Sequence, residues 1–139
     1  FNHPLEITEK AESVINNFIK LGIPIMNQTV LLRCVNDSVE VETELSNKLL
    51  SLRVKPYYLF QGDLVQGTAH LRVPLSKGLE IEKGMRESLS GLGLPQYTID
   101  LPQGGGKVPV ESRYNKGMKD GVWTFSTIDG EERHYPEDV

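Results

Sequence analysis

The chain has 139 residues, of which 24% are charged, and its formal net charge at pH 7 is -4. A mildly acidic chain without a basic cluster argues against binding to nucleic acid or to an anionic membrane, and no apolar run reaches the roughly 20 residues that cross a bilayer. The single cysteine, Cys34, excludes an internal disulfide and favours a reducing compartment, so a cytoplasmic protein is expected.

The first part of the chain predicts a helix followed by a strand. Apolar residues from Ala11 to Ile19 recur at the spacing of a core-facing helix. Thr8 is the expected N-cap of this helix, and Gly22 is the expected residue just after its end. Residues 25–32 then predict a mostly buried strand.

The middle of the chain predicts two further helices with a strand between them. Asp37, with a glutamate three positions later, resembles a capping box that opens a helix reaching Leu52. Residues 54–60 predict the second strand, and a long polar loop covers residues 61–74. Ser76 is the expected N-cap of the third helix.

The order of these elements predicts the fold class. Residues 97–101 alternate as a third strand, and helices alternating with strands predict an α/β fold with a parallel sheet. Three strands cannot close a barrel, so we expect a partial (half) TIM-like β/α barrel of about three βα units over residues 1–110. An Asp-Gly turn at 129–130 predicts a C-terminal β-hairpin appendage within a β-rich extension, residues 111–139.

Polar residues collect where the predicted strands end. Gln28 lies within the first strand, Asp63 follows the second by three residues, and Asp100 and Lys107 come at the end of the third. In parallel α/β sheets, the carboxyl ends of the strands carry the functional groups. Two carboxylates beside a lysine-bearing pocket would favour the binding of an ammonium group.

The glycine run before Lys107 allows three hypotheses. It is a flexible connection with a solvated lysine, a phosphate-binding loop, or a cradle for an anion beside an amine nucleophile. The phosphate loop GxxxxGK[ST] fails, because leucine and valine stand at its first glycine and its hydroxyl position. The cradle would use the amides of Gly104, Gly105 and Gly106, and an aldehyde cofactor with a phosphate, pyridoxal phosphate, needs that combination. The residues alone leave the first and third hypotheses open.

Four segments together resemble the lysine 2,3-aminomutase family of the radical S-adenosylmethionine superfamily. They read FNHPLEIT, GIPIMNQTVLLRCVND, VKPYYLFQGDLVQGTAHLRVPLSKGLEI and SGLGLPQYTIDLPQGGGKVPV, and they cover residues 1–110. The tail matches only loosely. The resemblance implies the C-terminal part of a radical-SAM α/β barrel, in an isomerase that interconverts L-lysine and β-lysine by radical 1,2-amino migration.

The resemblance also implies roles for individual residues. Lys107 corresponds to the lysine that forms an imine with pyridoxal phosphate and passes it to the substrate amine. Asp63 and Asp100 correspond to aspartates that hold the side-chain ammonium of lysine, and glutamate-specific relatives lack this acidic pair. Gln28 is expected to contact the methionyl part of S-adenosylmethionine.

The chain departs from the family pattern in three ways. Gln103 replaces the first of four glycines, Phe60 stands where a tyrosine is common, and the CxxxCxxC motif that binds the [4Fe-4S] cluster is missing. The chain also begins at Phe1 without a methionine. We therefore expect a fragment that is inactive alone, with the cluster ligands in a missing N-terminal half. Homo-oligomerisation would cover its open sheet edges.

Two alternatives stay open at this point. The stretch VQGTAH echoes a related aminomutase that acts on a protein-linked lysine, which would change the substrate but not the chemistry. A non-catalytic assembly module, in which the glycine run is only structural, is the alternative outside the enzyme class.

Overall fold

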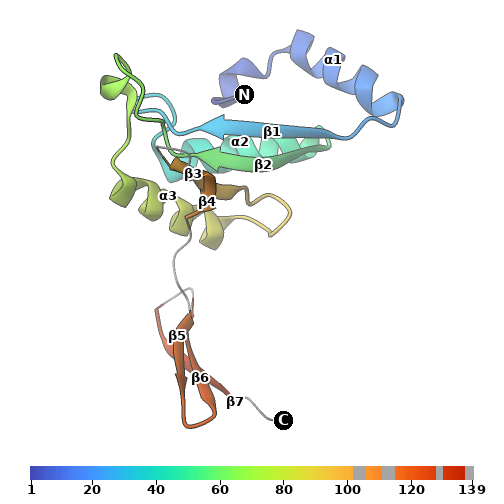
Figure 1. Ribbon diagram of the computed structural model, residues 1–139. Coiled ribbons are helices and arrows are strands. Elements are labelled where there is room, and N and C mark those ends of the chain that lie inside the picture. The colour runs from blue at the N-terminus through green and yellow to red at the C-terminus, as the bar shows by residue number, and fades with distance from the viewer. Residues whose placement is uncertain (102–105, 111–114, 128–129, 137–139) are drawn as a thin grey trace.

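The computed structural model describes residues 1–101, 106–110, 115–127 and 130–136. In this part of the chain, a four-stranded sheet with helices forms the main body, and a small second sheet follows (Figure 1). The main body contains α1 (Glu9–Lys20), α2 (Val39–Ser51), α3 (Leu75–Ser88), β1 (Ile25–Val30), β2 (Val54–Phe60), β3 (Gln96–Leu101), β4 (Gly106–Pro109) and two short 3-10 helices, η1 (Pro4–Glu6) and η2 (Ala69–Leu71).

The sheet mixes parallel and antiparallel pairs. Its strand order is β1-β2-β3-β4, in which β1 and β2 and then β2 and β3 pair in parallel. The predicted α/β class and the parallel strands are therefore confirmed. The fourth strand, β4, runs antiparallel to β3 and was not predicted, because residues 102–108 read as a glycine-rich connection. The described strands form an open sheet, so the partial barrel stays a prediction.

Two apolar clusters hold the helices to the sheet. One joins α1 and α2 to β2, and its buried members are Ile7, Ile15, Leu45, Leu49 and Val54. The other joins α3 to the strands, and its buried members are Leu31, Leu59, Val73, Ile81, Met85 and Tyr97. Figure 1 shows α2 and α3 lying along the sheet, with α1 beside the edge strand β1. The opposite face of the sheet carries the candidate site.

The helix caps agree only in part with their prediction. The Thr8 hydroxyl accepts a hydrogen bond from the Ala11 amide, and Gly22 has a φ of 75°, so both ends predicted for α1 are confirmed. The N-cap of α2 is Ser38, not Asp37, because the Asp37 carboxylate accepts from Cys34 N in the preceding turn. Helix α3 begins after Pro74 without a side-chain cap, so the assignment of Ser76 was wrong.

The outer side of α1 stays open to solvent. Ile15 is buried, but Val14 and Phe18, which the sequence placed on the core-facing side, are 48% and 45% exposed. The apolar stripe of this helix is wider than the surface on which it packs.

Residues 115–136 form a three-stranded antiparallel sheet where the sequence predicted a hairpin. Its strands are β5 (Asn115–Lys119), β6 (Val122–Ser126) and β7 (Glu132–Pro136), in the order β5-β6-β7. The predicted hairpin is the β6–β7 pair, whose turn includes Gly130 at a φ of 87°. Residues 128–129 lie outside the described residues. None of the helices in the described ranges has the length and apolar character needed to span a membrane.

Candidate active site

Four of the predicted site residues line one cleft. Its volume is about 260 Å³, and its lining residues are Gln28, Val30, Phe60, Gln61, Asp63, Asp100 and Lys107. Small-molecule sites usually measure roughly 300 to 1,000 Å³, so the cleft is open and small for a complete site. Four residues that come from β1, the loop after β2, β3 and β4 are thus brought together.

Lys107 reaches this cleft because it lies on β4. It pairs with Asp100 in the antiparallel register of β3 and β4, and cross-strand partners project from the same face of a sheet. Gly106, just before it, has a φ of 77°, a conformation that side chains other than glycine rarely adopt. The other two predicted cradle residues, Gly104 and Gly105, lie outside the described residues.

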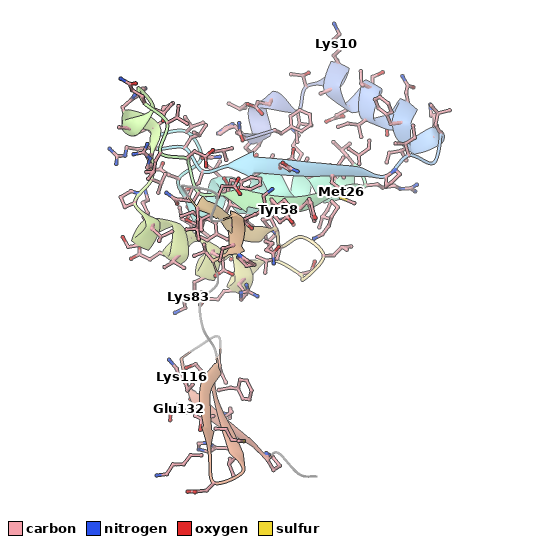
Figure 2. All side chains as sticks on the ribbon, viewed as in Figure 1. Lys10, Met26, Tyr58, Lys83, Lys116 and Glu132 are labelled. Carbon is pink, nitrogen blue, oxygen red and sulfur yellow. The ribbon has the colours of Figure 1, made fainter. Side chains whose placement is uncertain are left out.

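The Lys107 ammonium lies over two aromatic rings. Its Nζ atom is 4.6 Å from the centroid of Phe60 and 4.8 Å from that of Tyr58, within the range of a cation–π interaction. Figure 2 labels Tyr58, which projects from β2 in the middle of the sheet. Within the described ranges no carboxylate lies within ion-pair distance of this ammonium, so aromatic faces are what hold it.

Tyr58 was missed as a site residue, although the sequence carries a signal for it. Residues two apart in a strand face the same side, so Tyr58 belongs with Phe60. Their rings tilt against each other at 5.3 Å between centroids. The hydrogen bond with its neighbour Tyr57, then desolvation and the charge of Tyr57, raise the pKa of Tyr58 above its usual value of 10.

Asp63 and Asp100 share the wall of the cleft beside the lysine. Both also line two adjoining hollows of about 260 and 310 Å³. Within the described part of the chain neither carboxylate has a hydrogen-bond or ion-pair partner. The backbone of Asp63 is held, since the Arg72 guanidinium donates two hydrogen bonds, of 3.3 and 3.0 Å, to its carbonyl oxygen. Two unpaired carboxylates facing one space attract a cation.

Gln28 completes the group from the edge strand β1, at the opposite end of the strand order from β4. It is the register partner of Tyr58 across the β1–β2 pair, and its side chain is exposed into the cleft. Its neighbours in β1, Asn27 and Thr29, are buried and hydrogen-bonded to each other, at 2.8 Å. This strand therefore fixes where Gln28 projects.

The chemistry of the lining suits a cofactor that offers an aldehyde to an amine. The cleft presents one primary amine, aromatic faces, an amide side chain and two carboxylates, and in the part that the structure describes Lys107 is its one cation. A lysine amine is the nucleophile for imine formation. No group of three or more His, Cys, Asp or Glu side chains that could bind a metal ion occurs among the described residues.

Comparison with known proteins decides the family. No protein-family model matches the chain. It is 50% identical over 114 residues to the L-lysine 2,3-aminomutase of Clostridium subterminale, which is 82% of this chain and 27% of that protein. It is 37% identical over 137 residues to the L-lysine 2,3-aminomutase of Bacillus subtilis, which is 99% of this chain and 29% of that protein.

The chain belongs to the lysine 2,3-aminomutase family. It spans less than a third of the length of these two relatives, which agrees with the expectation of a C-terminal part of such an isomerase. Within this aminomutase family, the glutamate 2,3-aminomutase of Clostridioides difficile is 41% identical over 114 residues. Overall identity therefore does not fix the amino acid substrate, and the lining of the cleft has to be used for that purpose.

Proposed function

We propose that this chain forms part of the active site of an L-lysine 2,3-aminomutase. The observation that carries the proposal is that Gln28, Asp63, Asp100 and Lys107, which are up to 79 positions apart in the sequence, line one cleft. The family relationship supports the reaction class, and the two carboxylates in the cleft favour an amino acid with a side-chain ammonium. The rest of the reaction site would come from the remainder of the full-length enzyme, within the proposed partial barrel.

Lys107 would hold the cofactor. Bound as an imine, pyridoxal phosphate supplies the π system through which an amino group migrates between neighbouring carbons. The rings of Tyr58 and Phe60 place the Lys107 amine at a defined point of the cleft floor. The amide of Gly106 and the aromatic faces offer a close approach to a planar ring.

Asp63 and Asp100 would select the substrate. Their two negative charges attract the side-chain ammonium of lysine and repel the side-chain carboxylate of glutamate. The pair fits L-lysine better than L-glutamate. Sequence identity alone does not separate the two substrates, because it is 50% to a lysine aminomutase and 41% to a glutamate aminomutase. A lysine on a protein surface has the same ammonium, so the comparison of free L-lysine with a lysyl-bearing protein distinguishes those two substrates.

Gln28 would contact the second cofactor, S-adenosylmethionine. Its amide is exposed into the cleft from β1, on the side away from β3 and β4, and offers both a donor and an acceptor. The [4Fe-4S] cluster that family members use with this cofactor would be bound by cysteines outside this chain.

The test of the proposal is chemical labelling of the full-length enzyme. After incubation with pyridoxal phosphate and reduction with borohydride, peptide mapping is expected to find the pyridoxyl group on Lys107. Lys107→Ala is expected to remove the label and the activity, while Lys119→Ala, an exposed lysine of β5, leaves both unchanged. A label on another lysine, or full activity of Lys107→Ala, would favour a structural role for the glycine run.

A further inference from the structure

A buried hydrogen-bonded chain lies directly behind the cleft. The Tyr97 hydroxyl donates to Gln61 Oε1 at 2.5 Å, and Gln61 Nε2 donates to the carbonyl oxygen of Val73 at 2.7 Å. Tyr97 and Gln61 are 1% and 6% exposed. Gln61 also lines the cleft, so these hydrogen bonds connect the wall of the cleft to the core.

The orientation of the Gln61 amide is fixed by its partners. A backbone carbonyl can only accept, so the amide nitrogen has to face Val73. The amide oxygen then faces Tyr97, which has to donate. Desolvation and the nearby Glu82 raise the pKa of Tyr97 to about 12, which keeps its hydroxyl protonated across the neutral range. Both polar ends of the Gln61 amide are thus used in holding the fold, leaving little capacity for a ligand.

A glycine on α3 makes room for the hydrogen-bonded side chains of Tyr97 and Gln61. A Cβ atom on Gly78 would lie 1.9 Å from the Tyr97 hydroxyl oxygen and 3.3 Å from Gln61 Oε1. Any side chain at position 78 would therefore displace the hydroxyl. Glycine inside a helix costs about 1 kcal/mol relative to alanine, and here the close approach explains its use.

The same two hydrogen bonds close the loop that carries Asp63. Gln61 is the first residue after β2, and Val73 lies at the end of the connection, just before α3. The Gln61 side chain therefore ties the two ends of the loop together. Within the loop, Arg72 donates to the Asp63 carbonyl oxygen, and Arg33 N donates to Leu71 O at 2.8 Å. The loop that carries Asp63 is thus held by one buried hydrogen bond at its ends and by exposed hydrogen bonds along its length.

Tyr97 and Asp100 lie on the same strand, three residues apart. The chain of hydrogen bonds therefore joins the strand that carries one carboxylate to the loop that carries the other. We propose that Tyr97 and Gln61 are positioning residues that fix Asp63 relative to Asp100 and thereby set the length of the ammonium substrate that the cleft accepts. This inference rests on the proposed function, in which these two carboxylates hold the substrate ammonium.

The test uses the full-length enzyme and two amino acids that differ by one methylene, L-lysine and L-ornithine. Tyr97→Phe deletes the hydroxyl and keeps the ring. We expect the KM for L-lysine to rise about tenfold, since a buried partner loses its hydrogen bond, with kcat and the labelling of Lys107 nearly unchanged. The ratio of kcat/KM for L-lysine over L-ornithine should fall about tenfold as well. Tyr135→Phe, on β7 of the second sheet, is the matched control and should change neither quantity.

Two further variants separate the possible failures. Asp100→Ala tests the proposed function itself: if L-lysine use is unchanged, the acidic clamp is wrong. If Asp100→Ala impairs L-lysine use while Tyr97→Phe leaves KM and the ratio as in the wild type, the positioning role is wrong. Should Tyr97→Phe fail to fold, Gln61→Met removes both hydrogen bonds of the amide and keeps a side chain of similar length. A wild-type ratio and KM in that variant would then overturn the inference.

Discussion

At the scale of single residues, Lys107 and Glu42 show two ways to place an ionisable group. Lys107 is exposed at the cleft and rests on aromatic rings, whose attraction for a cation is worth about 0.5 to 2 kcal/mol. That is enough to orient the amine and far less than would block its reaction. Glu42 on α2 is 1% exposed, and its Oε1 atom has no hydrogen-bond partner in the described part of the chain.

The burial of Glu42 predicts a pH dependence of stability. Desolvation raises the pKa of this carboxyl from 4.5 to about 8, so the folded state takes up a proton that the unfolded state has released. Its contribution to the free energy of unfolding is therefore most favourable below pH 4.5, declines as the pH rises, and is lost above about 8. The loss should be on the order of a few kcal/mol.

Urea denaturation at pH 5 and pH 8.5 measures this effect. Glu42→Gln should flatten the pH dependence relative to the wild type, because the amide cannot ionise. Glu44→Gln, at an exposed glutamate of the same helix, serves as the control and should follow the wild type. If the free energy of unfolding changes equally between the two pH values for wild type and Glu42→Gln, the carboxyl does not titrate on unfolding.

At the scale of elements, the contact between α2 and α3 depends on a second helical glycine. A Cβ atom on Gly84 would lie 2.6 Å from Val39 Cγ2, and valine has little freedom to turn away. Gly84→Ala should therefore destabilise the chain by about 1 to 2 kcal/mol, although alanine is the better helix former. In a double-mutant cycle followed by thermal denaturation, Val39→Ala should recover most of that loss. Additive effects would contradict the proposed contact.

The helices and parallel strands could be predicted because their signals are local. Apolar spacing, the Thr8 cap and the glycine at position 22 are all encoded within a few residues of each element. The errors come from tertiary competition: Asp37 was drawn into a turn and an ion pair with Lys77, which left Ser38 to cap α2. Strand β4 was missed because its identity depends on pairing with β3 and not on its own composition.

At the scale of the whole molecule, apolar surface continues from α1 to the edge strand. Five large apolar side chains are exposed along this path: Val14, Phe18, Leu21, Ile23 and Met26. Figure 2 shows Met26 at the start of β1. An edge strand beside an apolar surface is a template for further association.

We therefore expect the 139-residue chain to self-associate when prepared alone. Met26→Lys places a charge on the edge strand and should shift sedimentation velocity profiles towards the monomer. Met118→Lys, at an exposed methionine of β5, is the matched control and should have little effect. If both variants shift association equally, the contact surface is not at β1.

The sequence pointed to four residues of the candidate cleft but not to the contacts that hold them in place. Positions at strand ends and the family resemblance pointed to Gln28, Asp63, Asp100 and Lys107, and all four line the cleft. The buried support from Tyr97 and Gln61 was not visible, because it joins residues 36 positions apart through side-chain contacts. Pattern analysis finds the groups that face a ligand more readily than the groups that hold them.

The antiparallel pairing of Asp100 with Lys107 has a consequence for how such a site can diverge. The separation of the two charges is set by the backbone ladder between β3 and β4. Substitutions elsewhere that keep the register of these two strands therefore keep acid and amine at the same spacing. Under the proposed roles, one half of the ammonium clamp and the lysine that attaches the cofactor are thus held by the same pair of strands.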